Sequence, residues 1–224
     1  MNNNFQDDQR EKDMIDLFKL QKVEDEGRSG VDAFFDYNGK LIPFELKTTS
    51  TTSVTTVRDF GPEHIKKWKN KHWLIGFFSK GKEFYKYASP LFMEKWINEK
   101  EKYISNDFAL AKILPEKIDL SDMFKIIGEK PFYSLEDAKL IQKQQYKKKD
   151  YIDLQDIKNG YSQDRMLQII KDRSKYLIER GSTLNNPHIP NKYFLVCPEI
   201  TNNHAEQLKI LIDKYFEEIS NLKL

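Results

Sequence analysis

Polar and apolar residues alternate over residues 31–47, on either side of the dipeptide Asn38-Gly39. This alternation predicts two half-buried strands, 31–37 and 40–47. Asn-Gly between two apolar runs predicts a two-residue turn, because both turn positions require a positive φ that Asn and Gly adopt readily. The segment is therefore expected to be a β-hairpin with one apolar face and one polar face.

Further along the chain, the pattern predicts one more buried strand and many helices. Residues 72–78 form a nearly continuous apolar run, as expected of a strand that is buried on both faces. Pro62 is tolerated at the start of a helix, which we expect to extend to about residue 70. By periodicity and turn residues, the other expected elements are strands at 83–87 and 193–196 and helices at 9–22, 90–103, 134–149, 163–180 and 203–222.

These elements predict an α/β fold with a mixed central sheet flanked by helices and a largely helical C-terminal half. We expect residues 1–90 to form a core that carries the hairpin. Residues 91–224 are expected to be a helical part of the same domain that contributes to partner recognition and dimerisation. A length of 224 residues suits one ordinary domain with an appended lobe.

Composition narrows the class of protein. Hydrophobic residues make up 39% of the chain, enough for a buried core, and charged residues make up 32% but nearly cancel to a net charge of +2. A nucleic-acid-binding surface would therefore have to come from local clusters of basic residues. The single cysteine, Cys197, excludes an intramolecular disulfide and lies in an apolar run typical of a buried structural thiol. No stretch is long and apolar enough to span a membrane and the N-terminus carries no secretory signal, so we expect a soluble, cytoplasmic protein.

The hairpin turn fixes which residues lie opposite one another. With Tyr37 paired to Lys40, Asp32 lies opposite Glu45, and Lys47 shares their face. A bulge at Pro43 would shift this register by one residue. The other face of the hairpin is apolar and consists of Val31, Ala33, Phe35, Ile42, Phe44 and Leu46.

Two opposed carboxylates and an amine on one face suggest a metal site. Directly opposed residues have Cβ atoms about 5 Å apart, and like charges there are destabilising unless a cation lies between them. Oxygen ligands alone favour a hard ion, magnesium first. An ammonium group beside the ion can orient a water molecule and stabilise charge on a phosphate oxygen. The alternative is a solvated hairpin whose charged outer face has no catalytic role.

The hairpin also carries a family resemblance. Gly30-Val31-Asp32, a twelve-residue gap and Glu45-Leu46-Lys47 at the end of an apolar strand resemble the PD-(D/E)xK nuclease signature. The predicted helix and buried strand that follow match the order of elements in that family's core. With the hydroxyl-rich run Thr48–Thr56 and Arg58-Asp59-Phe60-Gly61-Pro62, the segment looks most like a type II restriction endonuclease. The resemblance covers residues 24–80, and Val31 stands where the family nominally has proline.

The resemblance implies a restriction-endonuclease-like core in which Asp32 and Glu45 bind Mg²⁺ together with the backbone carbonyl of Leu46. Lys47 would assist the attacking water, and hydrolysis of the phosphodiester bond would leave a 5′-phosphate and a 3′-hydroxyl. In this family an acid from the first helix or its end sometimes joins the metal site. The candidates are Glu11, Glu24 and Glu26, and the simpler interpretation of each is an ordinary surface charge.

Three segments are candidates for contacts with double-stranded DNA. Hydroxyl groups directly after the catalytic strand are frequent phosphate donors, although a polar β-branched strand would have the same composition. A lysine cluster at the end of the predicted helix 134–149 suits either DNA or a solvated helix face. The third segment is the polar loop 185–188. The expected DNA-binding residues are Thr48, Thr49, Ser50, Thr51, Thr52, Ser53, Arg58, Lys147 and Lys148.

The function that these features predict is Mg²⁺-dependent, sequence-specific cleavage of double-stranded DNA. A homodimer is expected, because two identical active sites cut two strands symmetrically. The sequence leaves two alternatives open: a DNA-repair or Holliday-junction nuclease of the same fold, and a non-catalytic DNA-binding protein with a nuclease-like fold. The four histidines show no metal-ligand spacing, and we expect a surface or capping role for His64.

Overall fold

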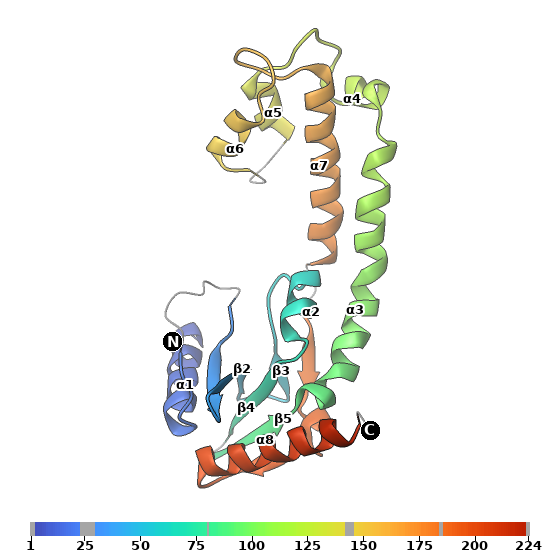
Figure 1. The fold of residues 1–224 in the computed structure, drawn as a ribbon. Coiled ribbons are helices and arrows are strands. Elements are labelled where there is room, and N and C mark those ends of the chain that lie inside the picture. Colours follow the sequence, from blue (N-terminus) through green and yellow to red (C-terminus); the bar gives the residue numbers. More distant parts are fainter. Residues whose placement is uncertain (1–2, 23–29, 80, 142–145, 184–185, 223–224) are drawn as a thin grey trace. The chain divides into compact units, whose positions relative to one another are not determined.

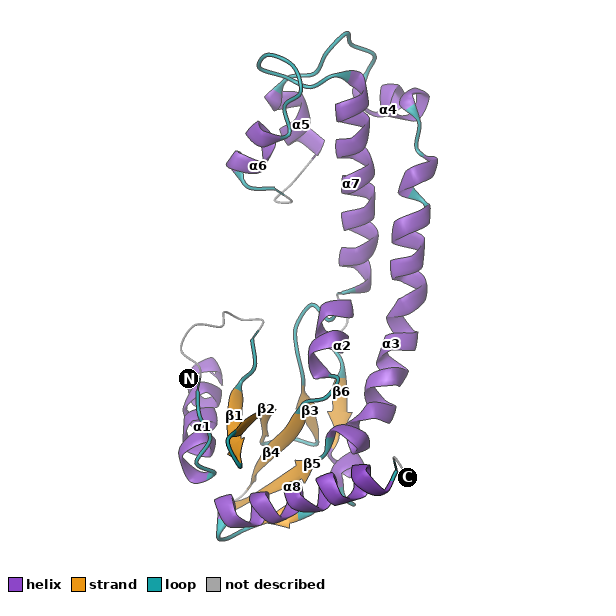
Figure 2. Ribbon diagram, in the orientation of Figure 1, coloured by secondary structure: helices purple, strands orange, loops and turns teal. Residues whose placement is uncertain are grey.

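The computed structural model describes residues 3–22, 30–79, 81–141, 146–183 and 186–222. The chain forms two compact units: unit 1 combines Met1–Glu101 with Asn186–Leu224, and unit 2 is Lys102–Asn185. The named strands belong to unit 1, and the described part of unit 2 is mainly helical (Figure 1, Figure 2). This division differs from the one expected at residue 90, because the C-terminal 39 residues of the sequence return to the unit that contains the hairpin.

Unit 1 is built on a five-stranded mixed sheet with the strand order β1-β2-β4-β5-β7. Strands β2 and β4 are parallel and the other neighbouring pairs are antiparallel, while β3 and β6 form a separate antiparallel pair. The strands are β1 (Ala33–Tyr37), β2 (Lys40–Thr49), β3 (Ser53–Thr55), β4 (His72–Ser79), β5 (Lys82–Ala88), β6 (His188–Pro190) and β7 (Glu199–Ile200). The helices of unit 1 are α1 (Asn3–Leu17), α2 (Pro62–Trp68), the first part of α3 (Pro90–Ile113), the 3-10 helix η2 (Asn191–Phe194) and α8 (His204–Asn221).

The predicted hairpin is confirmed, including its register. Asn38 and Gly39 have φ values of 53° and 81°, as a two-residue hairpin turn requires. The backbone N–H of Gly39 donates to Asp36 Oδ1 over 2.8 Å, which ties the turn to the first strand. Tyr37 pairs with Lys40 and Phe34 pairs with Pro43, so no bulge shifts the register at the proline.

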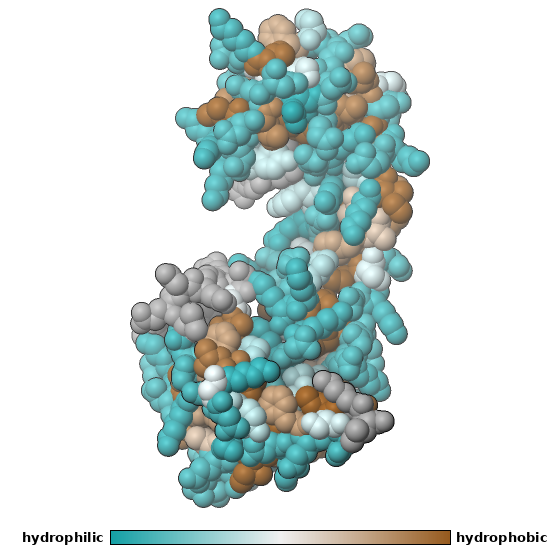
Figure 3. Space-filling model, in the orientation of Figure 1, coloured by the Kyte–Doolittle hydropathy of each residue, from teal (hydrophilic) through white to brown (hydrophobic). Residues whose placement is uncertain are grey.

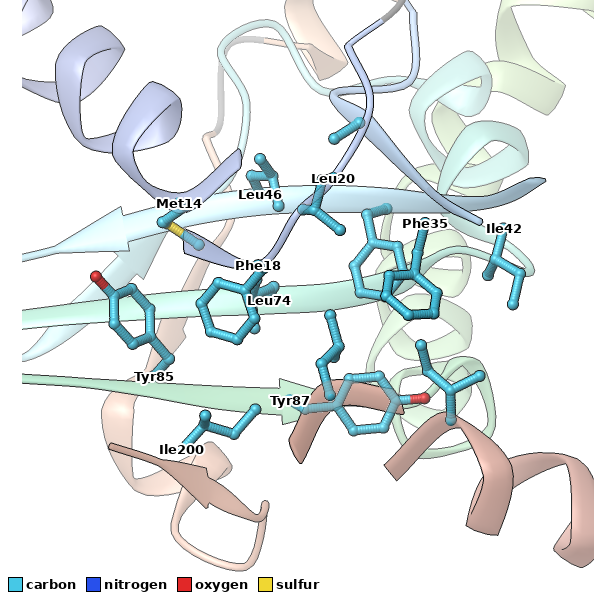
Figure 4. Close-up of a cluster of buried hydrophobic side chains, with 14 residues drawn as sticks. Met14, Phe18, Leu20, Phe35, Ile42, Leu46, Leu74, Tyr85, Tyr87 and Ile200 are labelled. Atoms are coloured by element: carbon cyan, nitrogen blue, oxygen red, sulfur yellow. The ribbon is translucent and has the colours of Figure 1, made fainter. Parts of the chain in front are cut away.

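The two faces of the sheet are covered by different helices. One face packs against α1 and α8, and Figure 4 shows Met14 and Phe18 of α1 beside Leu46 and Leu74 of the sheet. Burying these side chains removes apolar surface from water and supplies the main stabilisation of unit 1. The buried members of this cluster are Met14, Phe18, Leu20, Ala33, Phe35, Ile42, Phe44, Leu46, Leu74, Tyr85, Tyr87, Ile200, Leu208 and Ile212.

Tryptophan side chains fill the space between the other face and helices α2 and α3. Trp68 of α2 lies 5.5 Å from both Trp73 of β4 and Trp96 of α3, measured between ring centroids. All three residues are buried, so they form part of the hydrophobic core of unit 1. Strand β4 is buried from His72 to Phe77, as its continuous apolar run predicted.

Unit 2 has a hydrophobic core of its own. It contains the rest of α3, η1 (Pro115–Lys117), α4 (Leu120–Ile127), α5 (Leu135–Ile141), α6 (Lys148–Asp153) and α7 (Gln163–Ser182). A short bridge joins Tyr133 to Tyr161, and the Tyr161 hydroxyl donates to the carbonyl of Tyr151 over 2.7 Å. The buried core consists of Met123, Tyr133, Ala138, Tyr151, Tyr161, Met166, Ile169 and Ile170.

Two sequence predictions about secondary structure are wrong. Residues 193–196 are not a strand: η2 occupies 191–194, and Leu195 and Val196 are 73% and 79% exposed. The apolar run therefore predicted more buried residues than the structure contains, because only Phe194 and Cys197 of the run are buried. The single helix expected at 134–149 is replaced by α5 and α6, with residues 142–145 outside the described part.

The surfaces of the two units are mainly polar. Figure 3 shows hydrophilic side chains over most of the visible face of each unit, with apolar ones scattered between them. Among the helices that the structure describes, none combines the length and the apolar character needed to cross a bilayer.

His72 is a buried titratable group in the core of unit 1. Its ring stacks on Phe44 at 5.4 Å and its Nδ1 atom lies 2.6 Å from the Tyr87 hydroxyl. Burial lowers the pKa of His72 to about 3, because the imidazolium form would lose its hydration. The folded protein therefore holds His72 neutral, while the unfolded chain binds a proton below about pH 6.5.

The first prediction is that His72→Phe reduces the acid sensitivity of unfolding. The wild type should lose stability as the pH falls from about 6.5, because only the unfolded chain takes up this proton. Between pH 6.5 and 4.5 the variant should show a slope shallower by about 1 kcal/mol per pH unit, measured by urea unfolding. His188→Gln, which removes an exposed imidazole, is the control. Equal slopes for His72→Phe and the wild type would contradict the prediction.

Candidate functional site

Four charged side chains gather on the tryptophan-covered face of the sheet. Glu45 and Lys47 lie on β2, and Asp32 directly precedes β1. Extending the hairpin register by one residue places Asp32 beside Glu45, as the sequence predicted. The fourth is Lys71, which directly precedes β4. The parallel pairing of Glu45 with Trp73 brings Lys71 to the same face, because side chains alternate along a strand.

Asp32 is held by both the backbone and a side chain of β2. Its Oδ2 atom accepts the backbone N–H of Leu46 at 2.8 Å and lies 3.4 Å from Lys47 Nζ. Its side chain is 28% exposed, so it is partly accessible to solvent. Burial raises the pKa of Asp32 above its usual value, the charge of Lys47 opposes this rise, and the charge of Glu45 adds to it.

Glu45 is the most enclosed charge of the group, with only 4% of its surface exposed. Its Oε1 atom lies 2.9 Å from Lys47 Nζ and accepts the indole N–H of Trp68 at 3.3 Å. Its Oε2 atom lies 2.8 Å from Lys71 Nζ. Burial alone would raise the pKa of Glu45, but the two ammonium groups outweigh it and lower the pKa to about 2. Glu45 is therefore a carboxylate at every physiological pH.

The Lys47 ammonium marks a point where a cation is stabilised. Its Nζ atom lies 2.8 Å from the Leu46 carbonyl oxygen, 2.9 Å from Glu45 Oε1 and 3.4 Å from Asp32 Oδ2. These three oxygen atoms come from the residues that the family resemblance assigns to the metal. Two carboxylates and a carbonyl are ligands that Mg²⁺ prefers, so the donor set fits a hard divalent ion.

The carboxylates also fix the charge state of Lys47. Burial would lower the pKa of Lys47, but the charges of Glu45 and Asp32 raise it above its usual value. Glu11 of α1 contributes to the same rise, so the structure brings one of the three N-terminal candidate acids into the field of the site. Glu24 and Glu26 lie outside the described residues. Within the described part of the chain, no three His, Cys, Asp or Glu side chains gather to form a metal site.

Sequence reasoning missed Lys71 and Trp68 as members of this site. Lys71 is 4% exposed and also lies 3.4 Å from the Gly30 carbonyl oxygen. The sequence does contain one indication of its position. Lys71 stands two residues before Trp73 at the start of the apolar run, so in a strand the two side chains lie on the same face. The sequence does not reveal that this strand pairs with β2, so it could not place Lys71 beside Glu45.

The hydroxyl-rich segment after β2 folds into a tight loop and strand β3. Thr49 Oγ1 donates to the Ser53 carbonyl over 2.7 Å, and Thr51 Oγ1 donates to the same oxygen over 3.1 Å. Ser50 and Thr52 are exposed, whereas Thr48 and Ser53 are partly buried. The segment therefore combines hydroxyls that hold the loop together with hydroxyls that face solvent.

Strand β6, more than 130 residues later in the sequence, lies beside this segment. The Asn191 side-chain amide donates to the Thr51 carbonyl over 2.6 Å, and Thr55 Oγ1 lies 3.3 Å from His188 Nδ1. Asn186 Oδ1 accepts the backbone N–H of Asp59 at 3.2 Å. Two of the segments that the sequence singled out separately, 48–56 and the described end of 185–188, thus meet in one polar surface of unit 1.

The basic candidates are divided between the units. Arg58 belongs to unit 1, has a side chain that is 79% exposed and lies 3.7 Å from Asp59 Oδ2. Lys147 and Lys148 belong to unit 2, where Lys148 begins α6 and the backbone N–H of Lys147 donates to Asp150 Oδ2 over 2.8 Å. Both lysines are exposed. Lys143, which belongs to the lysine cluster that the sequence indicated near the end of the predicted helix 134–149, lies outside the described residues.

Two residues outside the cluster have the structural roles that the sequence predicted. His64 accepts the backbone N–H of Gly61 at Nδ1 over 3.2 Å, so it caps the start of α2. Cys197 is buried, and burial raises the pKa of its thiol to about 11. A thiol with that pKa is not a nucleophile near neutral pH.

Comparison with models of protein families gives no match to this chain, and comparison with curated proteins gives none either.

The second prediction is that Asp32→Asn stabilises the protein. Because the pKa of Asp32 is raised, ionised Asp32 disfavours folding above that pKa, and a neutral amide of similar shape removes this cost. The amide oxygen can still accept the Leu46 N–H. At pH 7 the variant should melt at a higher temperature than the wild type, measured by circular dichroism. Asp16→Asn, at an exposed position of α1, is the control and should leave the midpoint unchanged. A lower midpoint for Asp32→Asn would show that the carboxylate is mainly structural.

Proposed function

We propose that this protein is a magnesium-dependent endonuclease that cuts both strands of duplex DNA at specific sequences, as type II restriction enzymes do. The observation that carries this proposal is the set of three oxygen atoms around the Lys47 ammonium, from Asp32, Glu45 and the Leu46 backbone. Their order along the hairpin is the order of the PD-(D/E)xK signature. The mixed sheet with helices on both faces is compatible with the core of that family.

Asp32, Glu45 and the Leu46 carbonyl would hold the Mg²⁺ ion. When bound, the ion would neutralise charge on the scissile phosphate and lower the pKa of a bound water. The Asp32 side chain is 28% exposed and that of Glu45 only 6%, so Asp32 is the more accessible carboxylate for a substrate. In the reaction, the water oxygen forms a bond to phosphorus and the bond from phosphorus to the 3′ oxygen breaks. The 3′ oxygen takes up a proton, which leaves a 5′-phosphate and a 3′-hydroxyl.

Lys47 would act through its charge and its hydrogen atoms. Its raised pKa keeps it an ammonium group near neutral pH, so it is a hydrogen-bond donor and not a proton acceptor. A fixed ammonium of this kind orients the attacking water and stabilises negative charge that develops on the phosphate oxygens. The proton that the water loses must therefore go to another acceptor, such as solvent or a phosphate oxygen.

The polar surface formed by β3, β6 and their loops is the proposed DNA contact of unit 1. It follows the catalytic strand directly, and its exposed hydroxyls, Arg58 and His188 are groups that contact phosphates and base edges. Bonds from Asn191 and Thr49 within this surface hold the loop, so its exposed side chains are presented on a rigid support. Lys147 and Lys148 of unit 2 would add phosphate contacts. A homodimer acting on DNA in the cytoplasm would supply one such site for each strand.

The third prediction tests the reaction. With long duplex DNA and Mg²⁺, the wild type should give discrete fragments on a gel, and chelation of the metal should stop cutting. Lys47→Ala and Asp32→Ala should each lower the cutting rate at least about 100-fold while the fold is retained. Lys69→Ala, which removes a half-exposed lysine paired with Glu101, is the matched control and should cut normally.

Two other outcomes of this assay would argue against a restriction enzyme. Cutting that is confined to branched or damaged DNA would indicate a repair or Holliday-junction nuclease. Binding of DNA by the wild type without any cutting would contradict the enzymatic proposal.

The fourth prediction concerns the lysines of α6. Each lost phosphate contact reduces the salt dependence of DNA affinity by about 0.9 in the slope of log K against log salt. Lys147→Ala with Lys148→Ala should therefore lower this slope by about 2, measured by fluorescence anisotropy with a labelled duplex and no divalent metal. Lys112→Ala with Lys117→Ala, two exposed lysines of the same unit, should leave the slope unchanged. Equal slopes for the two double variants would exclude Lys147 and Lys148 from the DNA contact.

A further inference from the structure

We infer that Lys71 controls how tightly the site binds a divalent ion, so that the ion binds strongly only when a DNA phosphate is also present. This inference rests on the proposed function and extends it to the regulation of metal loading. It is carried by the position of Lys71, whose ammonium lies 2.8 Å from Glu45 Oε2.

Lys71 has a fixed and enclosed position. Only 4% of its surface is exposed, and its Nζ atom also lies 3.4 Å from the Gly30 carbonyl oxygen. Lysine is rarely buried to this extent unless it is paired. Its charge is therefore poorly screened by water and acts strongly on the carboxylate beside it.

The two lysines of the site differ in what a metal ion would do to them. Lys47 lies among the three oxygen atoms expected to hold the ion, so a bound ion would displace this ammonium from its present position to one beside the ion. Among the described residues, Lys71 lies within hydrogen-bonding distance of the other oxygen of Glu45 and of the Gly30 carbonyl, but not of Asp32 or the Leu46 carbonyl. Lys71 can therefore stay on Glu45 while an ion is bound.

A carboxylate that is already paired with an ammonium attracts a second cation less strongly. Asp32 and Glu45 bring two negative charges, and the ammonium groups of Lys71 and Lys47 offset both of them. Glu11 of α1 adds a smaller negative contribution at Lys47 than Glu45 and Asp32 do. A DNA phosphate at the site would return negative charge, so DNA and the metal ion would each strengthen the binding of the other.

A purely structural role for Lys71 makes a different prediction. In that case Lys71 only compensates the buried charge of Glu45, and its removal would destabilise the fold without strengthening metal binding. Metal affinity in the absence of DNA therefore separates the two roles, whereas stability does not.

The experiment measures Mn²⁺ binding to the full chain by electron paramagnetic resonance at pH 7, without DNA. Lys71→Met should bind Mn²⁺ about tenfold more tightly than the wild type, or more, because a unit charge close to a divalent ion has been removed. Lys71→Arg keeps the charge and should bind like the wild type. Lys69→Met, two residues away in an exposed ion pair with Glu101, is the matched control and should also bind like the wild type. Addition of duplex DNA should tighten Mn²⁺ binding to the wild type.

Unchanged or weaker Mn²⁺ binding by folded Lys71→Met would overturn the inference. If Lys71→Met does not fold, Lys71→Gln carries the same test, because it also removes the charge and can still donate a hydrogen bond to Glu45. If the wild type binds Mn²⁺ but neither Lys71→Met nor Lys71→Gln binds it more tightly, this inference alone would be overturned. Absence of Mn²⁺ binding by the wild type even with DNA would overturn the proposed function as well.

Discussion

The arrangement of unit 1 depends on keeping one carboxylate, Glu45, charged inside the protein. An isolated carboxylate would be neutralised in such surroundings, because burial penalises the ionised form. Glu45 stays ionised because Lys47 and Lys71 contact its two oxygen atoms and the Trp68 indole donates to one of them. These partners come from three elements that are separate in sequence, so the hairpin, α2 and the start of β4 must all be in place for the charge to be tolerated.

The buried charges of this arrangement reduce the stability of the fold, and a functional role would explain their presence. Replacing a buried ion pair with apolar side chains is often neutral or stabilising, so these charges are weak evidence for stability. Asp32 points the same way, because its pKa is raised and its ionised form disfavours folding. Such perturbed and clustered groups are typical of functional sites. In the proposed nuclease these charges have defined roles. The carboxylates would bind the metal ion, and the Lys47 ammonium would orient the water molecule and stabilise charge on the phosphate.

The sequence allowed the local geometry of the site to be predicted but not its tertiary partners. Asn38-Gly39 fixed the register of the hairpin, and with it the approach of Asp32 to Glu45, because a two-residue turn leaves no freedom. Lys71 could not be placed, since strand pairing between β2 and β4 is decided by packing across the whole sheet. The strand expected at 193–196 failed for a related reason: composition alone does not say which apolar residues are buried. The pairing of β3 with β6 likewise joins segments more than 130 residues apart.

The central claim is that the oxygen atoms around Lys47 form a divalent-ion site that acts on DNA. Crystals of the protein with duplex DNA and Mn²⁺, examined by anomalous diffraction, test it most directly. The account predicts an anomalous peak within bonding distance of the Asp32 and Glu45 carboxylates and the Leu46 carbonyl oxygen, with a DNA phosphate beside it. Well-ordered bound DNA with no ion at these oxygen atoms, or with its phosphates elsewhere on the protein, would contradict the account.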